Sequence, residues 1–153
     1  MGRGHGGYVE INPNHNYKDS GGKKVTDSGA IHIAEKYIAA GYESVFRQRH
    51  EDQKTYDLTI KTSNDVNYVK NIEVKQVVST NSSKLATNIG NAFEQVNKDG
   101  TVAIYLPNIK RNEMGEKFAQ EGFAEAQRKG WVVGNVEVWF SDTKSVKDKL
   151  DLN

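Results

Sequence analysis

Three residues near the middle of the chain have the types and the spacing of a metal-dependent hydrolytic site. Asp57 lies in a strand-like run, and a second run, reached after a short turn, contains Glu73 and Lys75. Alternate side chains of a β-strand share a face, so Glu73 and Lys75 are predicted to lie side by side. Two carboxylates on neighbouring strands can hold a hard divalent cation beside an ammonium group, and such an arrangement can hydrolyse phosphodiester bonds.

The same pair has a non-catalytic interpretation, because Glu-x-Lys is common on the solvated face of any strand. The chain is then a nucleic-acid-binding or protein-interaction module in which Glu73 and Lys75 form only an ion pair. The formal net charge of +1 argues against holding nucleic acid by bulk electrostatics alone. Basic pairs such as Lys110 and Arg111 are spread along the chain, as on an ordinary solvated surface.

Histidine offers a second enzymatic alternative, a ribonuclease that uses imidazole groups as acid and base without a metal ion. The spacing of the four histidines matches no zinc motif, so each is interpreted as an ordinary surface residue. They are His5, His15, His32 and His50.

The composition is that of one compact domain. With 153 residues the chain can bury a core, and without cysteine it has neither disulfides nor thiolate zinc ligands. No apolar run approaches the roughly 18 residues that span a bilayer, and the first residues lack the apolar stretch of a signal peptide. We therefore expect no membrane anchoring and no export signal within the chain.

The elements that must position the three residues follow from periodicity and turn signals. Residues 1–27 are rich in glycine and polar residues and are predicted to form a flexible lead-in to a single domain over residues 28–153. Predicted helices cover residues 28–40, 82–98 and 113–129, and predicted strands cover residues 43–49, 56–61, 68–78, 101–106 and 136–140. The polar tail from residue 142 is predicted to be a frayed helix. The order α-β-β-β-α-β-α-β predicts an α/β (α+β) fold of three layers, a central mixed sheet flanked by helices.

Apolar stripes define the inward faces of these helices. In the first helix the predicted stripe is Ile31, Ala34 and Ile38, and Glu35 lies only about 40 to 60° from it at 100° per residue. A carboxylate beside an apolar face calls for a cationic partner, although it can also reach out to water. The second helix is predicted to bury Leu85, Ile89, Ala92, Phe93 and Val96, and the third to bury Met114, Phe118, Gly122 and Ala126.

This order of elements, with its Asp and its Glu-x-Lys, resembles the PD-(D/E)XK nuclease superfamily over residues 28–107. The resemblance implies a restriction-endonuclease-like fold in which Asp57, Glu73 and Glu35 hold a divalent metal, Mg²⁺ before Zn²⁺ or Mn²⁺. It implies that Lys75 acts on the bound water or on the developing charge, and that Gln95, on the helix after the motif, faces the site. The sequence departs from the family in one respect, because no proline precedes Asp57.

The glycine-rich lead-in and the run from Ala34 to Tyr42 before the first core strand are similar to the C-terminal toxin domains of contact-dependent growth inhibition proteins and other polymorphic toxins. That similarity implies a domain of a larger secreted or cell-surface toxin that acts in the cytoplasm of a target bacterium. It implies a nucleic acid substrate, tRNA before DNA, and a cognate immunity protein as partner. A DNase of the same fold is the alternative.

Overall fold

A seven-stranded mixed sheet forms the centre of the protein, and its strands lie side by side in chain order. The structure is a computed structural model that describes residues 8–10, 27–47, 58–62, 69–96 and 100–153. The first four strands are antiparallel neighbours, the next two pair in parallel, and the last returns antiparallel. The strands are β1 (Tyr8–Glu10), β2 (Tyr42–Arg47), β3 (Leu58–Thr62), β4 (Val69–Gln76), β5 (Thr101–Leu106), β6 (Asn135–Phe140) and β7 (Leu150–Asp151).

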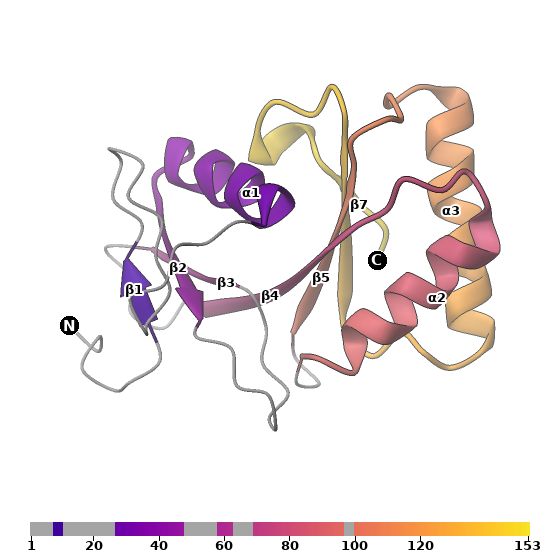
Figure 1. Cartoon of the computed structure of the whole chain (residues 1–153), viewed down its shortest axis with the longest axis horizontal. Coiled ribbons are helices and arrows are strands. Elements are labelled where there is room, and N and C mark those ends of the chain that lie inside the picture. The colour runs from indigo at the N-terminus through magenta and orange to yellow at the C-terminus, as the bar shows by residue number, and fades with distance from the viewer. Residues whose placement is uncertain (1–7, 11–26, 48–57, 63–68, 97–99) are drawn as a thin grey trace.

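In the described part of the chain, α-helices cover both faces of this sheet, as Figure 1 shows. Helix α1 (Ser28–Ala39) lies on one face, and α2 (Ser82–Phe93) and α3 (Glu113–Arg128) lie together on the other. Parallel strands need a long crossover, and α2 and α3 are the crossovers that join β4 to β5 and β5 to β6. The predicted mixed sheet between helices is therefore confirmed, with the predicted order of elements from α1 to β6.

Strand alternation separates two apolar cores. On β5, Val102 and Ile104 face α2 and α3, whereas Ala103 between them faces α1. The α1 side is also filled by Leu58 from β3 and Trp139 from β6. The nearly continuous apolar run of β5 is buried on both faces, as the sequence predicted.

Local sequence signals set the helix boundaries. The side chain of Asp27 accepts a hydrogen bond from the backbone N–H of Ala30 at 3.0 Å and caps α1. Asn112 caps α3 in the same way, through the N–H of Gly115 at 2.8 Å. The chain after α3 turns at Gly130 with φ of 73°, a left-handed conformation that glycine adopts without strain.

Several boundaries and faces differ from the predictions. Helix α2 ends at Phe93, because residues 94–96 form a turn instead of further helix. Met114 is 82% exposed, since the inward face of α3 is made by small residues that let α2 approach closely, such as Gly122 against Leu85. The predicted lead-in contains β1, which pairs with β2. The tail contains a short 3₁₀ turn at residues 146–148 and strand β7 instead of a frayed helix.

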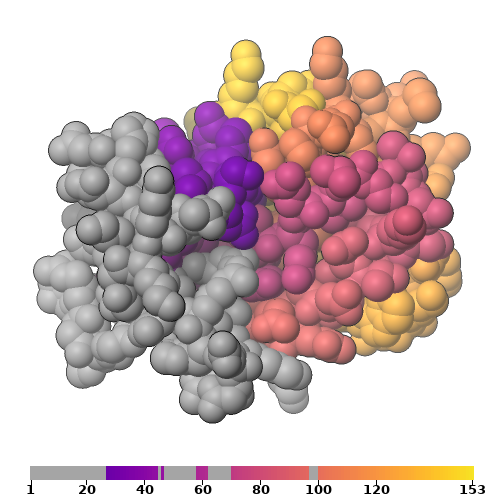
Figure 2. Space-filling model, in the orientation of Figure 1, coloured from indigo at the N-terminus to yellow at the C-terminus, as the bar shows by residue number. Residues whose placement is uncertain are grey.

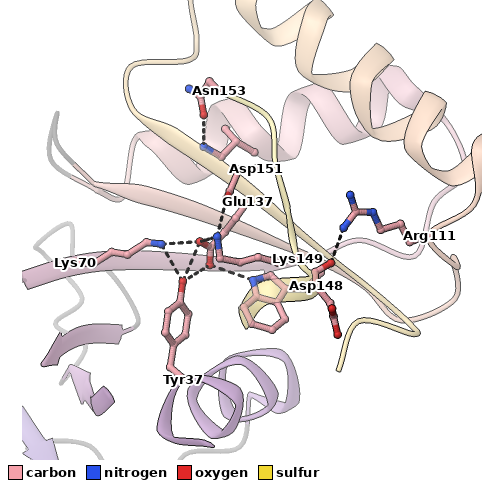
Figure 3. A network of polar contacts seen from close by, with 10 residues as sticks. Tyr37, Lys70, Arg111, Glu137, Asp148, Lys149, Asp151 and Asn153 are labelled. Atoms are coloured by element: carbon pink, nitrogen blue, oxygen red, sulfur yellow. Dashed lines mark hydrogen bonds and ion pairs between the residues drawn. The ribbon is translucent and has the colours of Figure 1, made fainter. Parts of the chain in front are cut away.

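A buried carboxylate ties α1 and the C-terminal segment to the sheet (Figure 3). Glu137 on β6 is 1% exposed and accepts hydrogen bonds from the Tyr37 hydroxyl at 3.0 Å, the Trp139 indole N–H at 3.0 Å and Lys70 Nζ at 2.7 Å. Lys149 Nζ lies 3.4 Å from the same carboxylate. Although burial would lower the pKa of Lys149, the charges of Glu137 and Asp151 raise it above its ordinary value.

These contacts predict that Glu137→Gln destabilises the fold strongly. The change leaves two ammonium groups beside a neutral amide in a buried place, which costs about 3 kcal/mol in the free energy of unfolding. Urea denaturation followed by circular dichroism measures the loss at pH 7. The raised pKa of Lys149 means that its contribution is present below the unfolded value of about 10.4 and is lost only as the pH rises through the folded value.

Glu121→Gln is the matched control, because Glu121 forms an exposed ion pair with Lys117 on α3. Exposed pairs of this kind contribute little, so its midpoint should equal that of the parent. Equal midpoints for Glu137→Gln and Glu121→Gln would show that the buried network does not stabilise the fold.

Candidate functional site

Glu73 and Lys75 lie side by side on β4, as predicted. Lys75 Nζ is 3.8 Å from Glu73 Oε2, and the two side chains differ sharply in exposure, 32% for Lys75 and 6% for Glu73. Both point away from α1, because the alternating residues Ile72 and Val74 belong to the core under that helix. The strand therefore presents a nearly buried carboxylate next to an ammonium group that solvent can reach.

The sheet face around this pair is polar. Asn71 precedes Glu73 on the same face, and the hydroxyl of Thr59 on β3 donates to Asn71 Oδ1 at 3.1 Å. Further along β3, Lys61 Nζ lies 3.7 Å from Glu43 of β2. Cross-strand pairs of this type stabilise a sheet modestly. We call these side chains the polar face: Glu43, Thr59, Lys61, Asn71, Glu73 and Lys75.

Glu73 stands at the border between this polar face and the apolar core under α2 and α3. Its partner on β5 is Val102, which belongs to that core. On its other side lies β3, whose Thr59 belongs to the polar face. A carboxylate at such a border can stay charged if a cation or hydrogen-bond donors meet it, and burial makes that electrostatic interaction stronger than it would be in water.

Asp57, the second predicted metal ligand, lies outside the described residues. It is one peptide bond from Leu58, whose partner on β4 is Ile72, the neighbour of Glu73. The predicted site requires that this antiparallel pairing extends by one more residue, which would bring Asp57 opposite Glu73. In an extended strand it would then share the face of Thr59.

Glu35 is not brought to this face. The buried stripe of α1 consists of Ala30, Ile33, Ala34 and Tyr37, whereas Ile31 and Ile38 of the predicted stripe lie at its flank and are only partly buried. At 100° per residue, Glu35 is about 150° from the centre of the observed stripe. Helix α1 also covers the sheet face opposite to Glu73. The structure therefore separates Glu35 from Glu73 and Lys75.

Gln95 lies at the same end of the sheet as Glu73, but in the turn after α2 and not on the helix. Its backbone N–H donates to the carbonyl of Ala92 at 2.9 Å. Helix α2 runs back along the sheet, so its last turn comes close to the start of β5, where Thr101 pairs with Ile72 (Figure 1). The side chain of Gln95 is partly buried.

His32 is a feature that the sequence interpretation missed, because it is not an ordinary surface residue. Its ring stacks on Tyr105 with centroids 4.9 Å apart and meets the edge of Trp139 at 6.4 Å. Its Nε2 is buried and has no hydrogen-bond partner among the residues that the structure describes. Burial, helped by the charge of Lys36, lowers the pKa of His32 despite the opposing influence of Glu35. His5, His15 and His50 lie outside the described residues.

The N-terminal half of α1, which carries His32, is fastened to the end of β4. The hydroxyl of Ser28 donates to Gln76 Oε1 at 3.3 Å, and the helix backbone at Gly29 approaches Tyr105 and Val74 closely. In Figure 2 the indigo surface of α1 adjoins the magenta surface of the segment that leads from β4 into α2. The contacts at Ser28 and Gly29, about one turn before His32, therefore hold this part of α1 against the ends of β4 and β5.

Among the described residues, no three His, Asp or Glu side chains gather closely enough to hold one metal ion. The metal site that the sequence predicts includes Asp57, which is not one of them. Each helix of the described residues is too short or too polar to span a bilayer. Comparison of the chain with protein-family models, with curated proteins and with solved structures gives no match.

The packing of His32 predicts an acid-sensitive contribution to stability. Because its folded pKa is depressed, the contribution is fully present above the unfolded value of about 6.5 and is lost as the pH falls through the folded value. His32→Phe keeps an aromatic ring against Tyr105 and cannot be protonated. The melting temperature of the parent should fall more between pH 7.5 and pH 5 than that of His32→Phe, and equal falls would contradict the prediction.

Proposed function

We propose that the protein is a metal-dependent nuclease that hydrolyses phosphodiester bonds at the polar face of the sheet. The observation that carries the proposal is the pairing of a nearly buried carboxylate, Glu73, with a reachable ammonium group, Lys75, at 3.8 Å on one strand. The surrounding order α1-β2-β3-β4-α2-β5 supports it, because it is the order of elements in the PD-(D/E)XK superfamily that the sequence resembles. A restriction-endonuclease-like fold is part of the proposal.

The donor set fits a hard divalent cation, since carboxylate oxygens are the ligands that Mg²⁺ prefers. In the proposed site Glu73 and Asp57 hold the ion, with help from the backbone carbonyl of Val74. Mg²⁺ is the first choice, and Mn²⁺ and Zn²⁺ are the alternatives. When bound, such an ion polarises the scissile phosphate and lowers the pKa of a coordinated water. Glu35 is left out of the ligand set, because α1 lies on the opposite face.

Lys75 can act both on the attacking water and on the phosphate group. Its ammonium group is reachable from solvent and is held near Glu73, so it can orient the attacking water. It can also donate to a phosphate oxygen as negative charge develops on the oxygens of the pentavalent phosphorane. Gln95, at the same end of the sheet, is proposed as a further polar contact to substrate or water.

The biological setting is proposed from the resemblance to polymorphic toxins. The chain is then the toxin domain of a larger secreted or cell-surface protein and acts in the cytoplasm of a target bacterium, where an immunity protein neutralises it. tRNA is the favoured substrate, and a DNase of the same fold is the alternative. A non-catalytic module is the competing class, because the contact between Glu73 and Lys75 is also what an inert ion pair would make.

Activity assays on four variants test the proposal. The protein is incubated with total RNA and with supercoiled plasmid, each with Mg²⁺ and with EDTA. Asp57→Asn, Glu73→Gln and Lys75→Met are expected to lower the cleavage rate about 10² to 10⁴-fold, the usual cost of losing a group that acts on the reacting atoms. Glu121→Gln, in the exposed pair with Lys117 on α3, is the matched control and should cleave as the parent does.

Circular dichroism of each variant shows whether the fold is intact. Cleavage by the parent that persists in EDTA would favour histidine chemistry over the carboxylate site. Full activity of a folded Glu73→Gln would make the assignment wrong, and the substrate that is cut, RNA or plasmid, separates the two nuclease alternatives.

A further inference from the structure

The pair formed by Thr59 and Asn71 lies beside the proposed site, and the proposed reaction assigns it no role. Thr59 is 2% exposed and donates its hydroxyl proton to Asn71 Oδ1 at 3.1 Å. Asn71 is partly exposed and lies on the same face as Glu73, two residues away along β4. At about 3.3 Å per residue, their Cα atoms are roughly 6.6 Å apart.

This hydrogen bond decides what Asn71 can bind. An asparagine side chain has one acceptor oxygen and an NH₂ group with two donor protons. Because Thr59 donates to the oxygen, the amide is oriented and its NH₂ group points away from Thr59. What Asn71 offers to a ligand is therefore a pair of neutral donors. Donors suit an anionic oxygen and do not suit a cation.

We propose that Asn71 is a substrate-positioning residue, whose amide NH₂ donates to a phosphate oxygen of the nucleic acid next to the scissile group. Thr59 acts through Asn71 and sets the orientation of its amide. The inference rests on the proposed function and deepens it, because it assigns the polar face on this side of Glu73 to the phosphate backbone. Contacts to phosphate oxygens fix the register of a nucleic acid on a protein without reading its bases.

Asn71 and Lys75 lie on opposite sides of Glu73 along β4. Lys75 follows Glu73 along β4 and Asn71 precedes it, so the two donors flank the nearly buried carboxylate. A phosphate backbone that runs along β4 would then meet a cation on one side of the cleaved bond and a neutral donor on the other. The neutral donor helps to hold the phosphate backbone in place and adds no positive charge beside the proposed metal.

Asn71→Asp is the decisive variant, because an aspartate oxygen still accepts the hydrogen bond from Thr59. The contact with Thr59 is kept, the NH₂ donors are lost, and one negative charge is added. Loss of a hydrogen bond to a charged group predicts a rise in KM of about tenfold or more, with kcat close to that of the parent. Thr59→Val should also raise KM, but by less than Asn71→Asp does. Thr59→Ser, which keeps the hydroxyl, should have the KM of the parent.

Binding is measured separately in a Glu73→Gln background, by fluorescence anisotropy with a labelled tRNA transcript or a labelled DNA duplex, whichever the parent cleaves. Adding Asn71→Asp should raise Kd by the same factor as KM. Asn108→Asp is the matched control, since Asn108 is exposed in the loop after β5 and the change adds the same charge.

The two ideas fail in different ways. A folded Glu73→Gln that cleaves as fast as the parent overturns the proposed function, and this inference with it. If Glu73→Gln is inactive but Asn71→Asp has the same KM and Kd as Asn108→Asp, the inference about Asn71 is wrong and the proposed function stands. Thr59 and Asn71 would then be a cross-strand pair that only stabilises the sheet.

Discussion

The buried carboxylate of Glu137 is the constraint on which the arrangement of this protein depends. Donors reach it from α1, from β4, from β6 itself and from the segment before β7, so four parts of the chain must be in place before its charge is satisfied. An unpaired charge at 1% exposure would be very costly. The network therefore selects one position of α1 on the sheet and one path for the C-terminal segment, whatever its net contribution to stability.

The same network explains why Glu35 is separated from the proposed site. The Tyr37 hydroxyl must face Glu137, and this fixes the rotation of α1 about its axis. Glu35, two residues earlier, is then about 160° away from Tyr37 around the helix. The apolar pattern of Ile31, Ala34 and Ile38 was compatible with a different rotation. The rotation of α1 is decided by a hydrogen bond between residues 100 positions apart. Helical periodicity cannot reveal such a contact.

The two faces of the sheet differ because the helices are unevenly distributed. Helices α2 and α3 pack against the apolar residues of β5 and β6, which form the core beneath these helices. On β3 and β4 several polar side chains face away from α1, and Thr59 and Asn71 pair there across the strands. Glu73 lies where these two regions meet, so that it is shielded from water on the side of Val102 and has polar neighbours on the side of β3. A reacting group in such a place can combine a strong local field with access to substrate.

The sequence by itself determined the order of elements, the mixed sheet between helices and the shared face of Glu73 and Lys75. These follow from local periodicity, capping residues and strand alternation, which act over a few residues. Only the tertiary structure decided the rotation of α1, the packing of His32 against Tyr105, the strand character of residues 150–151 and the network of Glu137. Each of these depends on contacts between residues far apart in the chain, and their free energy appears only when the layers are packed together.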